Sequence, residues 1–308
     1  MTRNRIDRRA IQLMALAVVG GIVLVAVYVV FVRTSAGQTW DDESLIGRVG
    51  GSRSTARMSQ RLLSMIDGLT IVAFAVVIVV VGIIRRRRRL ALVAAISAGA
   101  AIASAELLKL LLPRPELADS EVSALAGKAF DTYPSGHATI ATAFVLALVL
   151  VSRNTTRPAV ALFGVLWSSV IASGAVAAGW HRPSDVLGGI ALACFWLALG
   201  AWSLARRSAT YSAPGRMSRA MPLAAGFLIV ILLAGLSSSM LDGDPGLVPS
   251  NVSALIFPAS QILIDLFAVA VVAAFAVILR DVSFGSEAPS DDRATAVSAR
   301  VAAPEGGR

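Results

Sequence analysis

Trp180-His181-Arg182-Pro183-Ser184-Asp185 separates two long apolar runs, and the interpretation of the whole chain starts there. It holds one of the only two histidines in 308 residues. The other, His137, lies in Tyr133-Pro134-Ser135-Gly136-His137, again where an apolar run meets a polar stretch. Histidine titrates near neutrality and acts as an acid, base or nucleophile. Both histidines are therefore candidates for catalysis.

The composition is that of an integral membrane protein. The chain is 56% hydrophobic and only 15% charged, and its mean hydropathy is +0.74. The net charge of +9 does not indicate nucleic-acid binding, because the basic residues are almost all arginines at the ends of apolar runs. That placement is a signal of membrane topology. The single cysteine, Cys194, permits no intramolecular disulfide and is expected to be a small core residue.

Eight apolar runs are long enough to be transmembrane helices, which need about 20 residues. We therefore predict an all-α, polytopic membrane helix bundle. The first run is longer than a signal-peptide core and is expected to be retained. A polar, Gly/Ser-rich loop is expected at 33–61. The predicted spans are 10–32, 62–84, 90–112, 134–151, 159–180, 186–205, 220–240 and 254–279.

The spans suggest a division of the chain into four parts. Residues 1–89 would hold two helices with an outer loop, and 90–205 a catalytic core of four helices with the site loops. Residues 206–280 would hold two further helices. The tail at 281–308, rich in Ala, Ser, Pro and charge, is predicted to be disordered and cytoplasmic.

The arginines predict the topology. Five consecutive arginines at 85–89, with the basic residues near the N-terminus, at 153–157, at 206–219 and at 280, all fall on one side. The positive-inside rule makes that side cytoplasmic, with both termini inside. Lys109 ends the third span, His137 begins the fourth and His181 follows the fifth. Counting crossings places all three on the outer face.

The residues that meet on this face suit a phosphate group. Asp185 follows His181 by one helical turn, where its carboxylate can fix the imidazole tautomer. Ser135 and Gly136 stand at a helix N-terminus, whose free amides bind anions. Lys109 and Arg114 add two cations. Singly, these features are more often caps and snorkelling side chains; together they indicate a phosphate site.

The chain resembles the type-2 phosphatidic acid phosphatase superfamily, integral-membrane lipid phosphatases related to vanadium haloperoxidases. Its second motif, Pro-Ser-Gly-His, is unaltered at 134–137, and the His-x3-Asp half of the third is His181 to Asp185. The resemblance covers roughly 90–205 and implies a six-helix arrangement containing the core. Two departures stand out. Lys109 and Arg114 are separated by four residues rather than six, and Ala175 stands where the third motif has an arginine.

The resemblance implies a role for each residue. His181 would form a phosphohistidine, Asp185 would orient it and His137 would act as acid and base. The phosphate would be held by Lys109, Arg114, Ser135 and Gly136, with Arg182 as a substitute for the missing arginine. No metal or cofactor is implied.

The partner implied is a lipid phosphate: phosphatidic acid, phosphatidylglycerol phosphate or a polyprenyl diphosphate. Arginine-heavy, alanine-rich usage indicates a bacterial plasma (inner) membrane. Small-residue pairs permit helix association but do not indicate an oligomer.

Two other functions remain open at this stage. Loss of the third-motif arginine favours a catalytically weak or inactive member of the fold that binds phospholipid or a partner protein. A transporter that uses His and Asp to carry protons is the second alternative. Glu106, one turn before Lys109, either tunes the phosphate site or neutralises a charge. Asp265 in the last span is expected to pair with Gln261 or a neighbouring helix, or to belong to a proton path.

Overall fold

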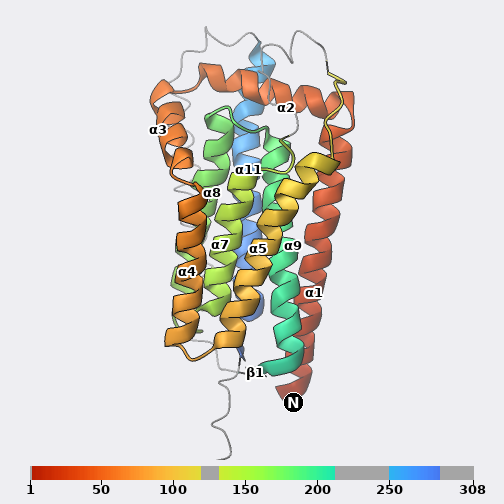
Figure 1. Cartoon of the computed structure of the whole chain (residues 1–308). Coiled ribbons are helices and arrows are strands. Elements are labelled where there is room, and N and C mark those ends of the chain that lie inside the picture. Colours follow the sequence, from red (N-terminus) through yellow and green to blue (C-terminus); the bar gives the residue numbers. More distant parts are fainter. Residues whose placement is uncertain (1, 119–131, 212–249, 285–308) are drawn as a thin grey trace, which may run out of the picture.

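The protein is a bundle of helices that run side by side, with one helix laid across an end (Figure 1). This computed structural model describes residues 2–118, 132–211 and 250–284. The predicted all-α membrane fold is confirmed. α1 continues into a short π-helical turn, Tyr28–Val32. The long helices are α1 Thr2–Val27, α4 Gly68–Ile84, α5 Arg88–Leu111, α7 Gly136–Val151, α8 Arg157–Ala177, α9 Pro183–Ser208 and α11 Asn251–Leu279.

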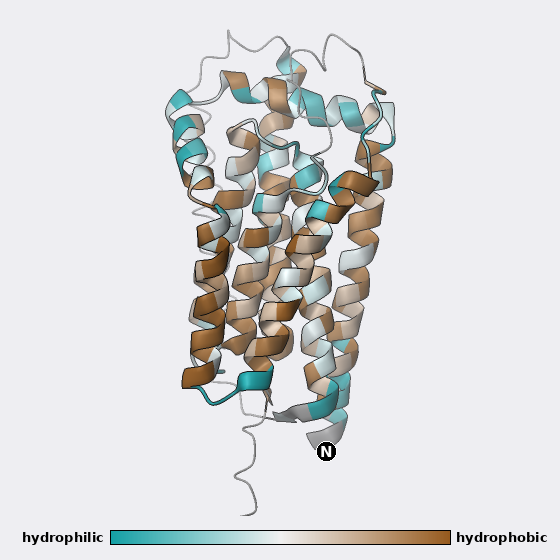
Figure 2. Ribbon diagram, in the orientation of Figure 1, coloured by the Kyte–Doolittle hydropathy of each residue, from teal (hydrophilic) through white to brown (hydrophobic). Residues whose placement is uncertain are grey.

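Apolar residues cover the middle of the bundle, and polar residues gather at its two ends (Figure 2). Among the described residues, 5 helices are long and apolar enough to cross a membrane, and a bent helix pair raises the number to 6. The apolar α7 is shorter, with 16 residues. Each predicted span therefore has its helix, except the span at 220–240, which lies outside the described residues.

The loop expected at 33–61 is wrong, because this segment forms two helices. α2 spans Ser35–Gly47 and α3 spans Arg53–Ser64. The side chain of Thr34 accepts a hydrogen bond from the amide of Gly37 at 3.1 Å and so caps α2. α2 lies across the end of the bundle (Figure 1) and buries Gln38, Asp41, Asp42 and Ser44.

The membrane helix expected from residue 62 begins later, at Gly68. The carboxylate of Asp67 accepts a hydrogen bond from the amide of Thr70 at 2.9 Å, which caps α4. α3 and α4 meet there at 65°. A carboxylate is stable at an exposed helix N-terminus and costly inside the apolar layer, so the chain turns at Asp67.

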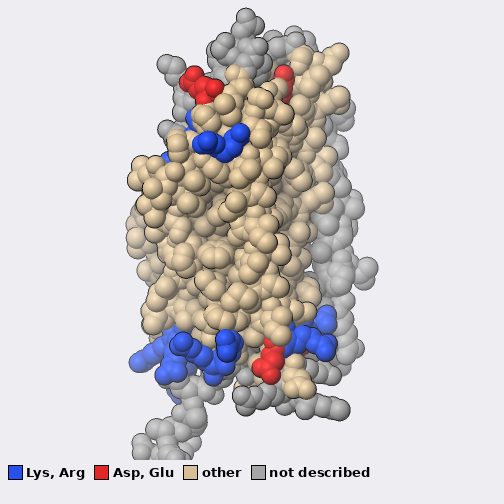
Figure 3. All heavy atoms as spheres, turned by 90° about the vertical axis from the view of Figure 1, so that its right-hand side faces the viewer, with Lys and Arg blue, Asp and Glu red and all other residues tan. Residues whose placement is uncertain are grey.

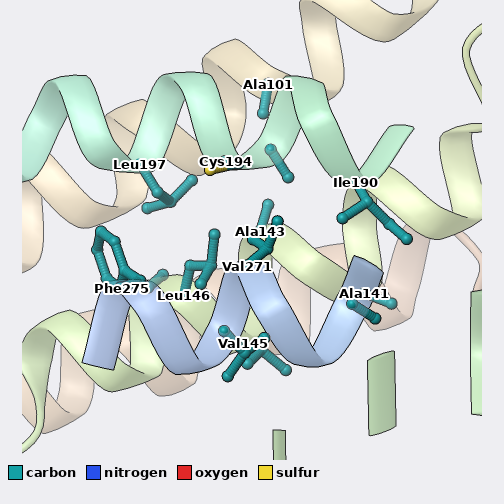
Figure 4. Packing of buried hydrophobic residues seen from close by; sticks show 14 of the residues in the cluster. Ala101, Ala141, Ala143, Val145, Leu146, Ile190, Cys194, Leu197, Val271 and Phe275 are labelled. Atoms are coloured by element: carbon teal, nitrogen blue, oxygen red, sulfur yellow. The ribbon is translucent and has the colours of Figure 1, made fainter. Parts of the chain in front are cut away.

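Small side chains bring the central helices close together (Figure 4). Ala141, Ala143 and Ala191 are fully buried, and leucines and Phe275 fill the space between them. A Cβ at Gly20 would lie 3.0 Å from the carbonyl oxygen of Ala191, so α1 packs directly on α9. Cys194 is buried in the same core, which confirms its predicted role.

The end of the bundle opposite α2 is held by arginines. Arg157 is buried and donates to the carbonyl oxygens of Val149 at 3.0 Å and Val282 at 3.2 Å. Strand β2 Val282–Phe284 pairs with β1 Ala209–Tyr211, so the first residues of the expected disordered tail are ordered.

Lys and Arg side chains gather at both ends of the bundle, separated by an uncharged band (Figure 3).

Candidate active site

His181 lies in the turn that joins α8 to α9. α8 ends at Ala177, and Gly179 reverses the chain with φ +76°, a conformation that side chains with a Cβ rarely adopt. The amides of Trp180 and His181 both donate to the carbonyl oxygen of Ala175, at 3.1 and 3.2 Å. Two hydrogen bonds to one carbonyl fix the backbone of His181, so its imidazole has a defined position.

Asp185 stands in the first turn of α9, directly behind His181. Its Oδ2 lies 3.7 Å from Nδ1 of His181, a buried nitrogen that makes no hydrogen bond among the described residues. The same oxygen accepts the amide of Arg182 at 3.0 Å and the hydroxyl of Thr132. The distance to His181 is longer than a hydrogen bond. Such pairs often tighten when substrate binds.

The two histidines face each other across the end of the bundle. The ring centroids of His137 and His181 are 5.9 Å apart and the rings are inclined by 61°. Trp180 packs against His137, with 5.4 Å between ring centroids. The sequence predicted that both would lie at one membrane face, and the fold brings them together from α7 and from the turn before α9.

Ser135 and Gly136 form the start of α7 beside the histidines. Ser135 caps the helix by accepting the amide of Ala138 at 3.4 Å, and its own amide donates to the carbonyl of Asp185 at 2.8 Å. Lys109 reaches this helix end from α5: its Nζ would lie 3.3 Å from a Cβ at Gly136. Lys109 also pairs with Glu106 at 2.8 Å.

The arginines predicted to bind phosphate both pair with carboxylates. Nη2 of Arg114 lies 3.1 Å from Asp41 and 3.3 Å from Asp185, and it donates to the hydroxyl of Ser184 at 3.0 Å. Nε of Arg182 lies 2.7 Å from Asp42. Both side chains are buried. Their phosphate-binding role stays a prediction. The ion pairs show that each arginine also neutralises a buried carboxylate.

Asp41 and Asp42 are site residues that the sequence reasoning missed. Both come from α2, in the segment expected to be a loop, and both are buried against the turn that holds His181. Asp41 accepts the amide and the hydroxyl of Ser184 as well as Arg114. The available signal was Thr34, a good helix cap seven residues before Asp41.

Burial raises the pKa of Asp41 to about 6. The charge of Asp185 raises this pKa further, while Arg114 and the hydrogen bonds from Ser184 lower it. A pKa of about 6 is close enough to neutral pH for the protonation of Asp41 to respond to pH.

The last span holds a separate polar contact. Asp265 accepts a hydrogen bond from the hydroxyl of Ser173 on α8 at 2.6 Å, and Gln261 donates to the carbonyl of Ser173 at 3.3 Å. Asp265 thus has a partner on a neighbouring helix. A proton path through Asp265 stays a prediction.

Residues 90–209 match the family model of the PAP2 superfamily. These residues form a PAP2 domain. Comparison with curated proteins and with solved structures gave no match. Members of this superfamily usually hydrolyse phosphate esters, which supports a phosphatase-type function in a membrane protein.

The PAP2 domain contains both histidines, Asp185 and every residue predicted to hold the phosphate. α1, α2, α3 and α4 lie before it and α11 after it. Asp41 and Asp42 therefore reach the site from outside the domain. Within the described ranges no cluster of three or more His, Cys, Asp or Glu fits a metal ion; metal independence stays a prediction.

Proposed function

We propose that the protein is a membrane lipid phosphatase that hydrolyses a phosphomonoester or diphosphate of a lipid through a phosphohistidine at His181. The observation that carries the proposal is the pair of facing imidazoles, 5.9 Å between centroids, with Asp185 behind His181. A nucleophile backed by a carboxylate and opposed by a second acid–base group suits a two-step displacement.

In the first step, Nε2 of His181 attacks phosphorus, and the N–P bond forms as the bond to the leaving oxygen breaks. His137 gives that oxygen a proton, and Asp185 stabilises the new imidazolium through Nδ1–H. In the second step, His137 removes a proton from water, whose oxygen attacks phosphorus. The N–P bond breaks, and inorganic phosphate and free His181 result.

The equatorial oxygens of the phosphate would meet the start of α7. The amide of Gly136, the hydroxyl of Ser135 and the ammonium of Lys109 converge there. Preorganised donors and cations of this kind stabilise charge in a phosphoryl transition state. Arg114 and Arg182, which also balance the buried carboxylates, would complete the phosphate site. In this scheme side chains supply all the positive charge, without a metal.

A lipid substrate agrees with the surroundings of the site. An apolar cavity of about 80 Å³ lies between α4, α5 and α7 and is lined by Phe74, Ile102, Ile140 and Phe144, among others. Ile140 is one helical turn from His137. A chain of the substrate would pack there while its phosphate lies at the histidines. Phosphatidic acid, phosphatidylglycerol phosphate and polyprenyl diphosphate all combine an apolar chain with a phosphate group.

We place the site on the extracytoplasmic face of a bacterial plasma membrane, with both termini in the cytoplasm. The arginine-rich turn between α4 and α5 lies at the opposite end of the bundle from α2, and positive loops favour the cytoplasm.

One observation favours a second function, a weak or inactive member that binds phospholipid. Ala175 supplies no cation at the position where the third motif of the superfamily has an arginine, and Arg182 is paired with Asp42. The two proposals differ in whether phosphate is released.

The deciding experiment measures inorganic phosphate released by the purified protein from the three lipids named above. We expect His181→Ala to lower the rate by about 1,000-fold or more, as loss of a nucleophile does. Thr39→Ala, an exposed change on α2 away from the histidines, should act as wild type. If wild type releases phosphate no faster than His181→Ala on every lipid, the phosphatase proposal fails. Phosphate bound to His181 in quenched wild type would support the intermediate directly.

A further inference from the structure

Arg48 lies against the turn that carries His181, although it is far from that turn in sequence. It begins a 3-10 turn, Arg48–Gly50, directly after α2. A Cβ at Gly179 would lie 2.5 Å from Cζ and 2.7 Å from Nη2 of Arg48. The guanidinium therefore rests on the backbone of Gly179, two residues before His181. Only a glycine leaves room for it there.

The charge of Arg48 has no counter-ion among the described residues. Its Nε is buried and makes no hydrogen bond within that part of the chain, and no carboxylate pairs with it there. Burial lowers the pKa of Arg48. A half-buried guanidinium without a partner is costly, and an anion beside His181 would offset that cost. By contrast, Arg114 and Arg182 already contact carboxylates.

The contacts of α2 with the site position Arg48 beside Gly179. Asp41 and Asp42 bind Arg114 and Arg182 from the middle of the helix, and Arg48 follows within two turns. On the other side of the turn, Ala175 is completely buried and its carbonyl accepts the amide of His181. α8 thus brings a methyl group to this corner, and the cation comes from α2.

We propose that Arg48 binds the phosphate group of the substrate beside His181, in the position that Ala175 leaves without a cation. This inference rests on the proposed phosphatase function and extends it. It makes the site a joint product of the PAP2 domain and the segment before it. A guanidinium presents two parallel N–H groups that match two phosphate oxygens, a fixed geometry that an ammonium lacks.

The test compares Arg48→Ala, Arg48→Gln and Arg48→Lys with wild type. We expect Arg48→Ala to lower kcat/KM by about 100-fold, as loss of one transition-state donor does. Inhibition by inorganic phosphate should weaken by roughly tenfold, the value of a hydrogen bond to a charged group. For both quantities, Arg48→Lys should lie between wild type and Arg48→Ala. Arg57→Ala removes an exposed arginine on α3 and serves as the matched control.

A purely structural role for Arg48 predicts a different pattern. It would lower the Tm of Arg48→Ala and leave the inhibition constant of phosphate within twofold of wild type, and that result overturns the inference. Arg48→Gln keeps much of the side-chain volume and repeats the measurement if Arg48→Ala does not fold. Phosphate binding is also measured by calorimetry, without turnover. If wild type binds phosphate but hydrolyses no lipid, the phosphatase proposal fails; if Arg48→Gln binds phosphate as wild type does, the Arg48 inference fails.

Discussion

At the scale of single residues, the site depends on how one guanidinium is shared. Arg114 lies between Asp41 and Asp185, and the hydroxyl of Ser184 accepts from Arg114 and donates to Asp41. A fully buried pair of carboxylates with one cation carries an excess negative charge, which is unfavourable. Asp185 must stay ionised to orient His181, so the excess is relieved most easily by a proton on Asp41. Burial, together with the charge of Asp185, raises the pKa of Asp41 to about 6.

The first residue-scale prediction concerns Asp41→Asn. The folded pKa of about 6 exceeds the usual 3.8, so the folded protein binds a proton more tightly than the unfolded chain. The stabilisation that comes from this proton is complete below the unfolded pKa of 3.8 and is lost as the pH rises through about 6. Asp41→Asn does not titrate. We expect the stability of wild type relative to Asp41→Asn to fall by about 2 kcal/mol between pH 4 and 7.

Thermal unfolding in detergent across this pH range measures the effect. The groups that interact with Asp41 are Arg114, Asp185, Ser184 and Tyr133, and the variant keeps all four residues. Parallel Tm curves for the two proteins would show that Asp41 does not titrate as stated.

At the scale of elements, α2 explains what the sequence did not reveal. Hydropathy finds long apolar helices, and it located the spans that lie within the described residues, apart from the start of α4 at Gly68. The buried face of α2 carries Gln38, Asp41, Asp42 and Ser44, which pack against charged groups of the site. A helix that buries polar residues has the composition of a loop, and hydropathy therefore predicts a loop for this segment. The His137–His181 pair was predictable because counting crossings needs only the spans.

The element-scale prediction is that α2 must sit directly on α11. A Cβ at Gly47 would lie 2.0 Å from the carbonyl oxygen of Ser253 and 2.9 Å from Cβ of Phe257. Gly47→Ala would push α2 away, together with Asp41, Asp42 and Arg48. Overpacking of this kind costs about 1–3 kcal/mol. We expect a lower Tm and slower phosphate release.

Gly68→Ala is the matched control, because a Cβ there meets nothing within 4 Å. Both variants add one methyl group at the end of a helix. Equal Tm values for the two would mean that the contact between α2 and α11 does not hold α2 in place.

At the scale of the molecule, the membrane makes most of the fold predictable from the sequence. Backbone polar groups in lipid must pair within one segment, so apolar runs become helices with ends at polar residues. The helix breaks that the sequence did not give, at Gly68 and around α2, lie outside this constraint. There the chain is shaped by caps such as Thr34 and Asp67 and by ion pairs with α9. These depend on residues distant in sequence.

The orientation in the membrane is the last prediction. The turn between α7 and α8 lies at the end that holds the arginine-rich segment, and α3 begins at the opposite end (Figure 1). Because arginines favour the cytoplasmic side, a cysteine at Ser54→Cys should react with an impermeant maleimide on intact cells, and one at Thr155→Cys only after permeabilisation. Both positions are exposed, and the native Cys194 is buried and should stay unlabelled. The reverse labelling would place the histidines in the cytoplasm, where a lipid phosphatase would meet the inner leaflet instead.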